Sequence, residues 1–177
     1  MGAHTAAALA LAHPERVRAL ALITPAADPD APRDEAEHAR WDALADGLRT
    51  GGVEGFMAAY GDPGVEGRDD YWRDTVLTVV RQRLARHVHP EAVADALHVV
   101  PRSEPLGSLS ELSRIAVPTV VVGSRDDADP GHPLATARRW AEAIDGAGWA
   151  LEDEGASPLA WQGAQLSKVI AGVADAG

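Results

Sequence analysis

The sequence of 177 residues predicts an α/β fold in which about three parallel strands are flanked by helices. Three short and nearly apolar runs occur at residues 17–24, 119–122 and 148–151. Such runs are typical of strands that are buried on both faces of a parallel sheet. Each run is followed by residues with helical periodicity, and this alternation is the pattern of right-handed crossover connections.

The first 24 residues predict a helix followed by a buried strand. Residues 6–12 are strong helix formers with small side chains, so this helix can lie close to a sheet. His13 and Pro14 end the helix, because proline lacks the N–H and disfavours helical geometry at the preceding residue. The apolar run from Val17 to Thr24 then predicts the strand, which stops at Pro25.

Between the first two strands, the sequence predicts a helical insert of about residues 34–100 with no strand pattern in it. Asp34 is a suitable N-cap for its first helix, with Glu37 three residues later, and the pair Gly51-Gly52 ends that helix. The expected helices of the insert are 34–49, 53–60, 70–87 and a fourth that starts at Pro90. After the insert, we expect helices at 106–115, 133–144 and 158–174.

The composition excludes several classes of function. The chain has 16 basic and 27 acidic residues, and a formal charge of −11 disfavours nucleic acid or an anionic membrane as a partner. It has no cysteine, so a disulfide framework and a thiolate metal site are both excluded. No lysine or arginine precedes the apolar start, which is also too short to span a bilayer, and we therefore expect a cytoplasmic protein without a cofactor.

The small-residue helix, the sequence HPERV and the apolar strand together resemble the segment that follows the nucleophile elbow Gly-x-Ser-x-Gly in α/β-hydrolases. By this resemblance, Met1 and Gly2 are the last two positions of the motif, and the serine is the residue before Met1. The backbone N–H of Met1 would then be one donor of the oxyanion hole. The resemblance predicts that the chain, residues 1–177, is a single incomplete domain that starts just after the catalytic serine.

A second stretch, VPTVVVGSRDD, resembles the strand and loop that carry the catalytic acid in this family. The resemblance implies that Asp126, three residues after Gly123, orients the catalytic base. Carboxyl ends of parallel strands are where the functional groups of open α/β sheets gather, so this location is physically reasonable. Asp126, Asp127, Asp129 and His132 also resemble a site for a hard cation, but their spacing matches neither an EF-hand nor a zinc pattern, and no metal site is predicted.

A third stretch, EDEGASPLAWQG, occupies the place where the family has its catalytic histidine. Here the residues are Gly155, Ala156 and Ser157, so the usual base is absent. His132 is the first candidate to replace it and His4 the weaker one, and both are also explained as ordinary surface or packing histidines. Neither Ser124 nor Ser157 is in an elbow motif, which disqualifies them as nucleophiles.

The insert of residues 34–100 resembles the helical cap over the active site of these enzymes. Its aromatic residues would line a substrate pocket, or they pack as an ordinary core at helical spacing; they are Trp41, Phe56, Tyr60 and Trp72.

Two functions remain open at this point. The first is an esterase-like hydrolase of a small-molecule substrate, active in a full-length form and inactive as this chain. The alternative is a non-catalytic relative that binds a ligand or a protein. The strand at Val17 to Thr24 would have an unpaired edge, which predicts that the isolated chain either aggregates or forms a homodimer through that edge.

Overall fold

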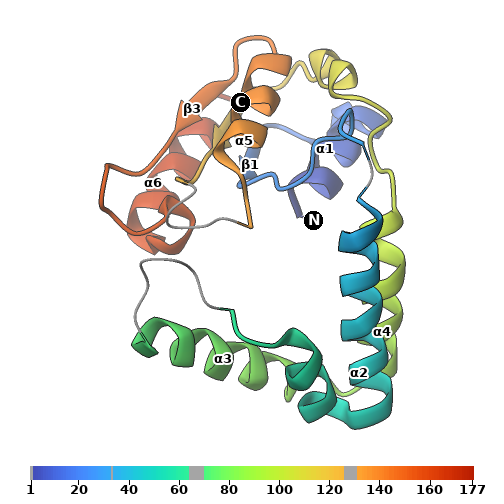
Figure 1. Cartoon of the computed structure of the whole chain (residues 1–177). Coiled ribbons are helices and arrows are strands. Elements are labelled where there is room, and N and C mark those ends of the chain that lie inside the picture. The colour runs from blue at the N-terminus through green and yellow to red at the C-terminus, as the bar shows by residue number, and fades with distance from the viewer. Residues whose placement is uncertain (1, 33, 64–69, 126–130) are drawn as a thin grey trace. The chain divides into compact units, whose positions relative to one another are not determined.

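Three short parallel strands form the sheet of this protein, in the order β1-β2-β3. They are β1 (Leu20–Ile23), β2 (Thr119–Val122) and β3 (Gly148–Ala150). Leu22 pairs with Val121, and Val122 pairs with Ala150. The computed structural model describes residues 2–32, 34–63, 70–125 and 131–177 (Figure 1). The predicted parallel three-stranded sheet is therefore confirmed.

The first strand is shorter than the sequence predicted. The run from Val17 was expected to be extended, but Pro14–Arg16 forms a 3-10 turn, η1, and the N–H of Val17 donates to the carbonyl of Pro14 at 3.2 Å. Pairing with β2 begins only where the N–H of Leu20 donates to the carbonyl of Pro118 at 2.9 Å. Proline before the run thus delays the strand by three residues.

The sheet belongs to one compact unit, Met1–Pro32 with Glu104–Gly177. Its helices are α1 (Gly2–Ala12), η3 (Leu109–Arg114), α5 (Leu134–Ala143), η4 (Leu159–Trp161) and α6 (Gly163–Ala174). The expected helix at 106–115 is a 3-10 helix, and the expected closing helix at 158–174 is divided at Gln162, which has φ −93° and ψ 76°.

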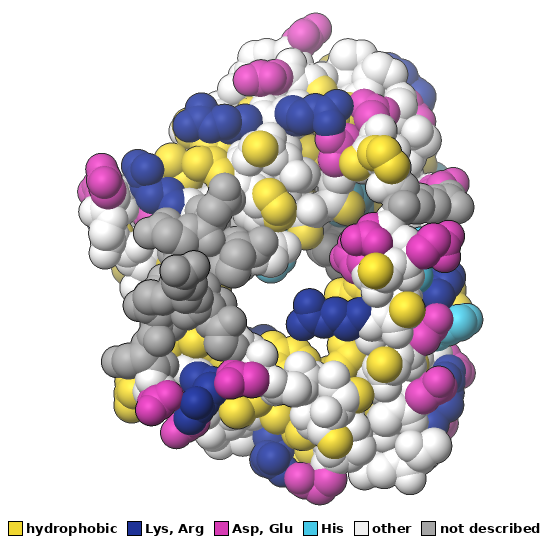
Figure 2. All heavy atoms as spheres, viewed as in Figure 1, with side chains coloured by type: hydrophobic (Ala, Val, Ile, Leu, Met, Phe, Trp, Pro, Cys, Tyr) yellow, Lys and Arg dark blue, Asp and Glu magenta, His cyan; other side chains and the backbone are white. Residues whose placement is uncertain are grey.

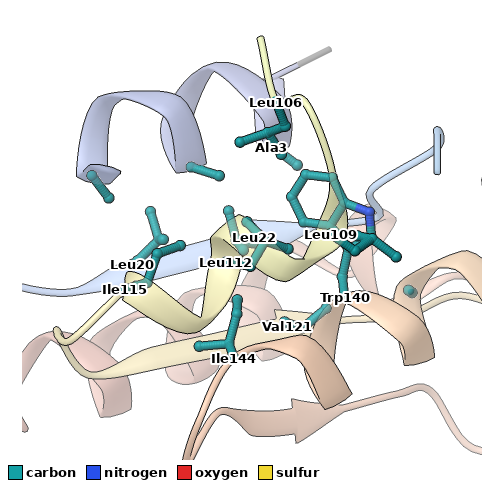
Figure 3. Close-up of a cluster of buried hydrophobic side chains, with 13 residues drawn as sticks. Ala3, Leu20, Leu22, Leu106, Leu109, Leu112, Ile115, Val121, Trp140 and Ile144 are labelled. Atoms are coloured by element: carbon teal, nitrogen blue, oxygen red, sulfur yellow. The ribbon is translucent and has the colours of Figure 1, made fainter. Parts of the chain in front are cut away.

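A single hydrophobic cluster fills the space between the sheet and three of these helices (Figure 3). Because side chains alternate along a strand, Leu20 and Leu22 of β1 point to the same face as Val121 of β2. The alanines of α1, the leucines around η3, and Trp140 with Ile144 at α5 cover that face. Helix α6 contacts β1 and β2 as well, outside this cluster.

In the second compact unit, Arg33–Ser103, the regular elements formed by the described residues (34–63 and 70–103) are all helices. They are α2 (Glu35–Tyr60), α3 (Asp70–Leu84), α4 (Pro90–Val99) and the short η2 (Val100–Arg102). Asp34 caps α2 as predicted, since its side chain accepts a hydrogen bond of 2.8 Å from the N–H of Ala36. The range of this compact unit, Arg33–Ser103, is close to that of the helical insert expected at residues 34–100. The role of the insert as a cap stays a prediction.

A kink divides α2 at the glycine pair that the sequence marks as a helix end. Gly52 has φ 58° and ψ −144°, a conformation that only glycine adopts without strain. The two halves come so close that a Cβ on Gly47 would lie 2.5 Å from the carbonyl oxygen of Gly55. The two helices predicted at 34–49 and 53–60 are therefore present as the two halves of α2, with the non-helical Gly52 between them.

Ion pairs join the helices of the second unit at its surface. Arg49 binds Asp95 at 2.8 Å and so joins α2 to α4, and Arg81 of α3 pairs with Glu54 of α2. Asp42 accepts from both His98 and Arg102 at 2.7 Å. In the view of Figure 2, acidic and basic side chains are interspersed on the surface of these helices. Exposed pairs of this kind contribute little each, so the buried leucines and Phe56 hold the unit together.

Candidate functional site

The ends of β2 and β3 lie side by side, and two loops leave the sheet there. Val122 and Ala150 are register partners, and the N–H of Gly123 donates to the carbonyl of Ala150 at 2.9 Å. Ser124 and Glu152 each lie two residues after these register partners, and their side chains are therefore next to one another. This is the edge at which open α/β sheets carry their functional groups.

Glu152 is the polar centre of this edge, and sequence analysis missed it. Its side chain is buried, with 4% of the residue exposed. One carboxyl oxygen, Oε1, accepts from the backbone N–H of Arg125 at 2.5 Å and from the hydroxyl of Ser124 at 3.5 Å. The other, Oε2, accepts from the N–H of Leu159 at 3.1 Å. These donors offset the cost of removing a carboxyl group from water.

Gly123 leaves room for the indole ring of Trp149. A Cβ at this position would lie 2.5 Å from Cη2 of the ring and 3.0 Å from Cδ1 of Leu134. The guanidinium of Arg138 lies over the same ring, 5.4 Å from its centre. The ring thus covers the point where β2 ends, and only glycine fits beneath it.

His4 is buried beside the hydrophobic cluster of the first unit. Its ring meets that of Trp140 edge to face, with centroids 4.6 Å apart. His4 Nε2 lies 3.2 Å from the carbonyl oxygen of Ala27, which also accepts from Nε1 of Trp140 at 3.1 Å. Because a carbonyl only accepts, Nε2 carries the proton. Burial lowers the pKa of His4, so the neutral ring is favoured.

The loop after β1 is anchored at the same edge of the sheet. Thr24 has φ 42°, which is uncommon for a β-branched residue, and its N–H donates to the carbonyl of Val122 at 2.9 Å. Further along the loop, Asp28 pairs with Arg139, and Asp30 accepts from the N–H of Leu109 at 3.3 Å. The loop is therefore fixed to α5 and η3 by charged and backbone groups.

Comparison with solved structures gives strong matches along nearly the whole chain. The enol-lactonase from Burkholderia xenovorans matches 98% of this chain with a TM-score of 0.68 and 22% sequence identity. MenH from S. aureus matches 97% with a TM-score of 0.70 and 17% identity. A thermophilic esterase from Thermogutta terrifontis matches 96% with a TM-score of 0.69 and 20% identity.

The chain has part of the α/β-hydrolase fold. It spans 62% of the lactonase, 64% of MenH and 60% of the esterase. No protein-family model and no curated protein sequence matches the chain. At these identities the likeness establishes the fold, which confirms the fold predicted from the resemblance.

Two residues that the α/β-hydrolase resemblance assigns to catalysis lie outside the described residues. They are Asp126, the proposed acid, and Met1, the proposed oxyanion donor. The described range 70–125 ends at Arg125, one residue before Asp126, and the N–H of Arg125 donates to the side chain of Glu152. His132 is half-buried and lies two residues before the start of α5. The catalytic roles of all three residues stay predictions.

The four aromatic residues predicted to line a substrate pocket lie in the helical unit. Phe56 is buried, and its ring stacks on that of Tyr60 with centroids 5.9 Å apart. Trp41 packs on the same cluster, and its Nε1 donates to Glu37 at 3.5 Å, while Trp72 is half-buried on α3. A shallow surface depression on this unit has other residues as its lining: Tyr71, Asp74, Thr75, Thr78 and Val79.

Metal binding and membrane insertion find no support in the part of the chain that the structure describes. Within residues 2–32, 34–63, 70–125 and 131–177, no three histidine, aspartate or glutamate side chains converge as metal ligands. Asp126, Asp127 and Asp129 of the imagined cation site lie outside these ranges. The described helices include none that is long and apolar enough to cross a membrane.

Proposed function

We propose that this chain is the carboxyl-terminal part of an α/β-hydrolase that cleaves an ester or a related small-molecule substrate. The observation that carries the proposal is the match of 96–98% of the chain to a lactonase and an esterase at TM-scores of 0.68 and 0.69. The acid loop at the end of β2 supports it, because the predicted acid follows Arg125 directly. The helical unit would serve as the cap.

The proposed reaction needs a serine that these 177 residues do not supply in an elbow motif. In the full-length form, the serine would precede α1, and Met1 would donate to the oxyanion. The serine oxygen attacks the ester carbonyl while its proton passes to a base, which returns it to the leaving alcohol. Water then attacks the acyl-serine, releases the acid and restores the serine. Asp126 would orient the base.

A second candidate is a non-catalytic relative that binds a ligand or a protein partner. The observation that favours it is the stretch Gly155, Ala156 and Ser157, which has no histidine where the family has its base. The backbone carbonyl of Ser157 accepts from Nε2 of Gln162 at 2.5 Å, so this loop is held in a closed turn without any histidine. Under this candidate the sheet edge and the helical unit would form a binding surface only.

The mass of the intact protein from its native source, together with the DNA upstream of Met1, tests the choice. A heavier product whose added residues end in Gly-x-Ser supports the hydrolase. A product of 177 residues would contradict the proposal of serine catalysis and would favour the binding function. A fluorophosphonate probe adds a chemical readout, because it labels only an activated serine: we expect labelling of the longer product and none of Ser124 or Ser157.

We also propose that the isolated chain pairs with a second copy through β1. Within the described residues, β1 pairs only with β2, so its other edge presents backbone groups for hydrogen bonding. Ala21 and Ile23 on this strand are half-buried. A sheet that continues across a two-fold axis would satisfy those groups.

A further inference from the structure

The carboxyl group of Glu152 binds two separate loops, one with each oxygen. Oε1 accepts from Ser124 and Arg125 in the loop after β2, whereas Oε2 accepts from Leu159, which closes the loop after β3. The register of the strands explains this, because β2 and β3 bring positions 124 and 152 together as their loops diverge. Glu152 is thus a shared acceptor at the point where the two loops separate.

A second contact strengthens the link between these loops. Nε of Arg125 donates to the backbone carbonyl of Glu152 at 3.4 Å. The side chain of each residue thus binds the backbone of the other. The turn that follows Glu152 uses Gly155 at φ 79° and ends at Pro158, which is buried. Position 157 is therefore held between Glu152 and the residue whose N–H binds Oε2.

The chemistry of this position requires a carboxylate. A carboxylate has two acceptor oxygens with about four lone-pair sites, and three of them have donors here. A glutamine offers one acceptor oxygen and would serve one loop only. An apolar residue would leave the N–H groups of Arg125 and Leu159 buried without an acceptor, which is costly.

We propose that Glu152 is a positioning residue that fixes Ser124 and Arg125, the first residues after the end of the strand β2 other than Gly123, relative to the loop of residues 153–159 after β3. The proposal rests on the proposed function, in which Asp126, directly after Arg125, is the acid and the stretch Gly155, Ala156 and Ser157 is where the family has its base. Glu152 acts by holding the N–H of Arg125, next to the proposed acid, and the N–H of Leu159, at the end of the loop after β3, on one carboxyl group.

Hydrogen exchange of the full 177-residue chain, measured amide by amide with NMR, tests the link. In Glu152→Ala, the amides of Arg125 and Leu159 should exchange about tenfold to a hundredfold faster, since each loses a hydrogen bond to a charged group. In Glu152→Gln, one of these amides should change and the other should not. Glu154→Ala, at an exposed neighbour, is the matched control and should change neither.

Protection of the Gly123 amide, which binds Ala150 within the sheet, reports whether each variant is folded. If Glu152→Ala does not fold, the size-preserving Glu152→Gln carries the test. Unchanged exchange at both amides in a folded Glu152 variant would overturn the proposal.

A second experiment reads the geometry between the loops. Ser157→His places an imidazole in the loop where the family has its base, and if Asp126 faces that loop as proposed, its carboxylate would raise the pKa of the imidazole above the ordinary value of about 6.5. We expect NMR titration to show that raised pKa, and to show its return toward the ordinary value when Glu152→Gln is added. A raised pKa that persists in the double variant contradicts the positioning role but supports Asp126 as the acid. An imidazole that is unperturbed with Glu152 intact contradicts the acid assignment, and the exchange experiment then decides the link alone.

Discussion

Gly123 lies beneath the indole ring of Trp149, so close that a Cβ would be 2.5 Å from the ring. The pair joins the end of β2 to the middle of β3, next to the loops that Glu152 holds together. Rigid aromatic rings do not move aside as flexible side chains do. The glycine is therefore required by packing, and its φ is not the reason.

Gly123→Ala should destabilise the protein by about 1–3 kcal/mol, because it forces extra volume into a packed site. Denaturation with urea, followed by circular dichroism, measures the loss. Gly163→Ala is the matched control, since a Cβ there meets nothing within 4 Å. Adding Trp149→Leu should recover part of the loss, and a double-mutant cycle without coupling would contradict the explanation.

Gly47 and Gly55 form a similarly close contact in the helical unit. They lie on either side of the kink at Gly52, where the two halves of α2 pack against each other. We predict that Gly55→Ala costs about 1–3 kcal/mol, because its Cβ would collide with the backbone carbonyl of Gly47, which cannot rotate away. Gly51→Ala, one residue before the kink, meets nothing within 4 Å and should be neutral or slightly stabilising. Equal effects of the two substitutions in urea denaturation would refute this account.

His4 gives the first unit a dependence on pH with a definite sign. Burial lowers its pKa in the folded state below 6.5, while the unfolded chain retains the ordinary value. Below pH 6.5 the unfolded state therefore binds more protons than the folded state, and the free energy of unfolding falls as pH decreases. The stabilisation is present above pH 6.5 and is lost between 6.5 and the lower folded pKa.

The substitution His4→Gln removes the titrating ring and keeps a donor for the carbonyl of Ala27. We expect the free energy of unfolding of this variant to fall less between about pH 7 and 5 than that of the wild type. His87→Gln, the same substitution at an exposed position, is the matched control. If the free energy of unfolding depended on pH in the same way for the wild type and for His4→Gln, His4 would contribute nothing to that dependence.

The sequence was sufficient for the architecture because its signals are local. Buried parallel strands are short continuous apolar runs, and Gly51-Gly52 marks the kink of α2 by its conformational freedom. Val17 shows the limit of this reasoning, since its apolar side chain predicted a strand where the turn at Pro14 prevents one. Boundaries depend on such neighbours more than on hydrophobicity.

Glu152 could not be identified from the sequence for a different reason. In the stretch EDEG it looks like one of several solvated charges, and Glu154 and Asp153 beside it are indeed exposed. Its donors are backbone N–H groups at positions 125 and 159, which every residue but proline has, so no pattern of residue types reveals them. Only its distance of two residues from the end of a strand was a signal.

The open edge of β1 allows a precise test of pairing between copies. The N–H groups of Leu20 and Thr24 donate to β2, so by the alternation along a parallel strand those of Ala21 and Ile23 face the open edge. Ala21→Pro removes an edge-facing donor without breaking the ladder to β2, and proline is tolerated on edge strands. If copies pair through this edge, sedimentation should show a dimer for the wild type and a monomer for Ala21→Pro.

Ala21→Ser is the control for this prediction, because it changes the same side chain but retains the backbone N–H. It should sediment as the wild type does. A wild-type chain that is monomeric in dilute solution would contradict pairing through β1. A dimer that survives Ala21→Pro would place the interface elsewhere, since backbone pairing at this strand needs the donor that proline removes.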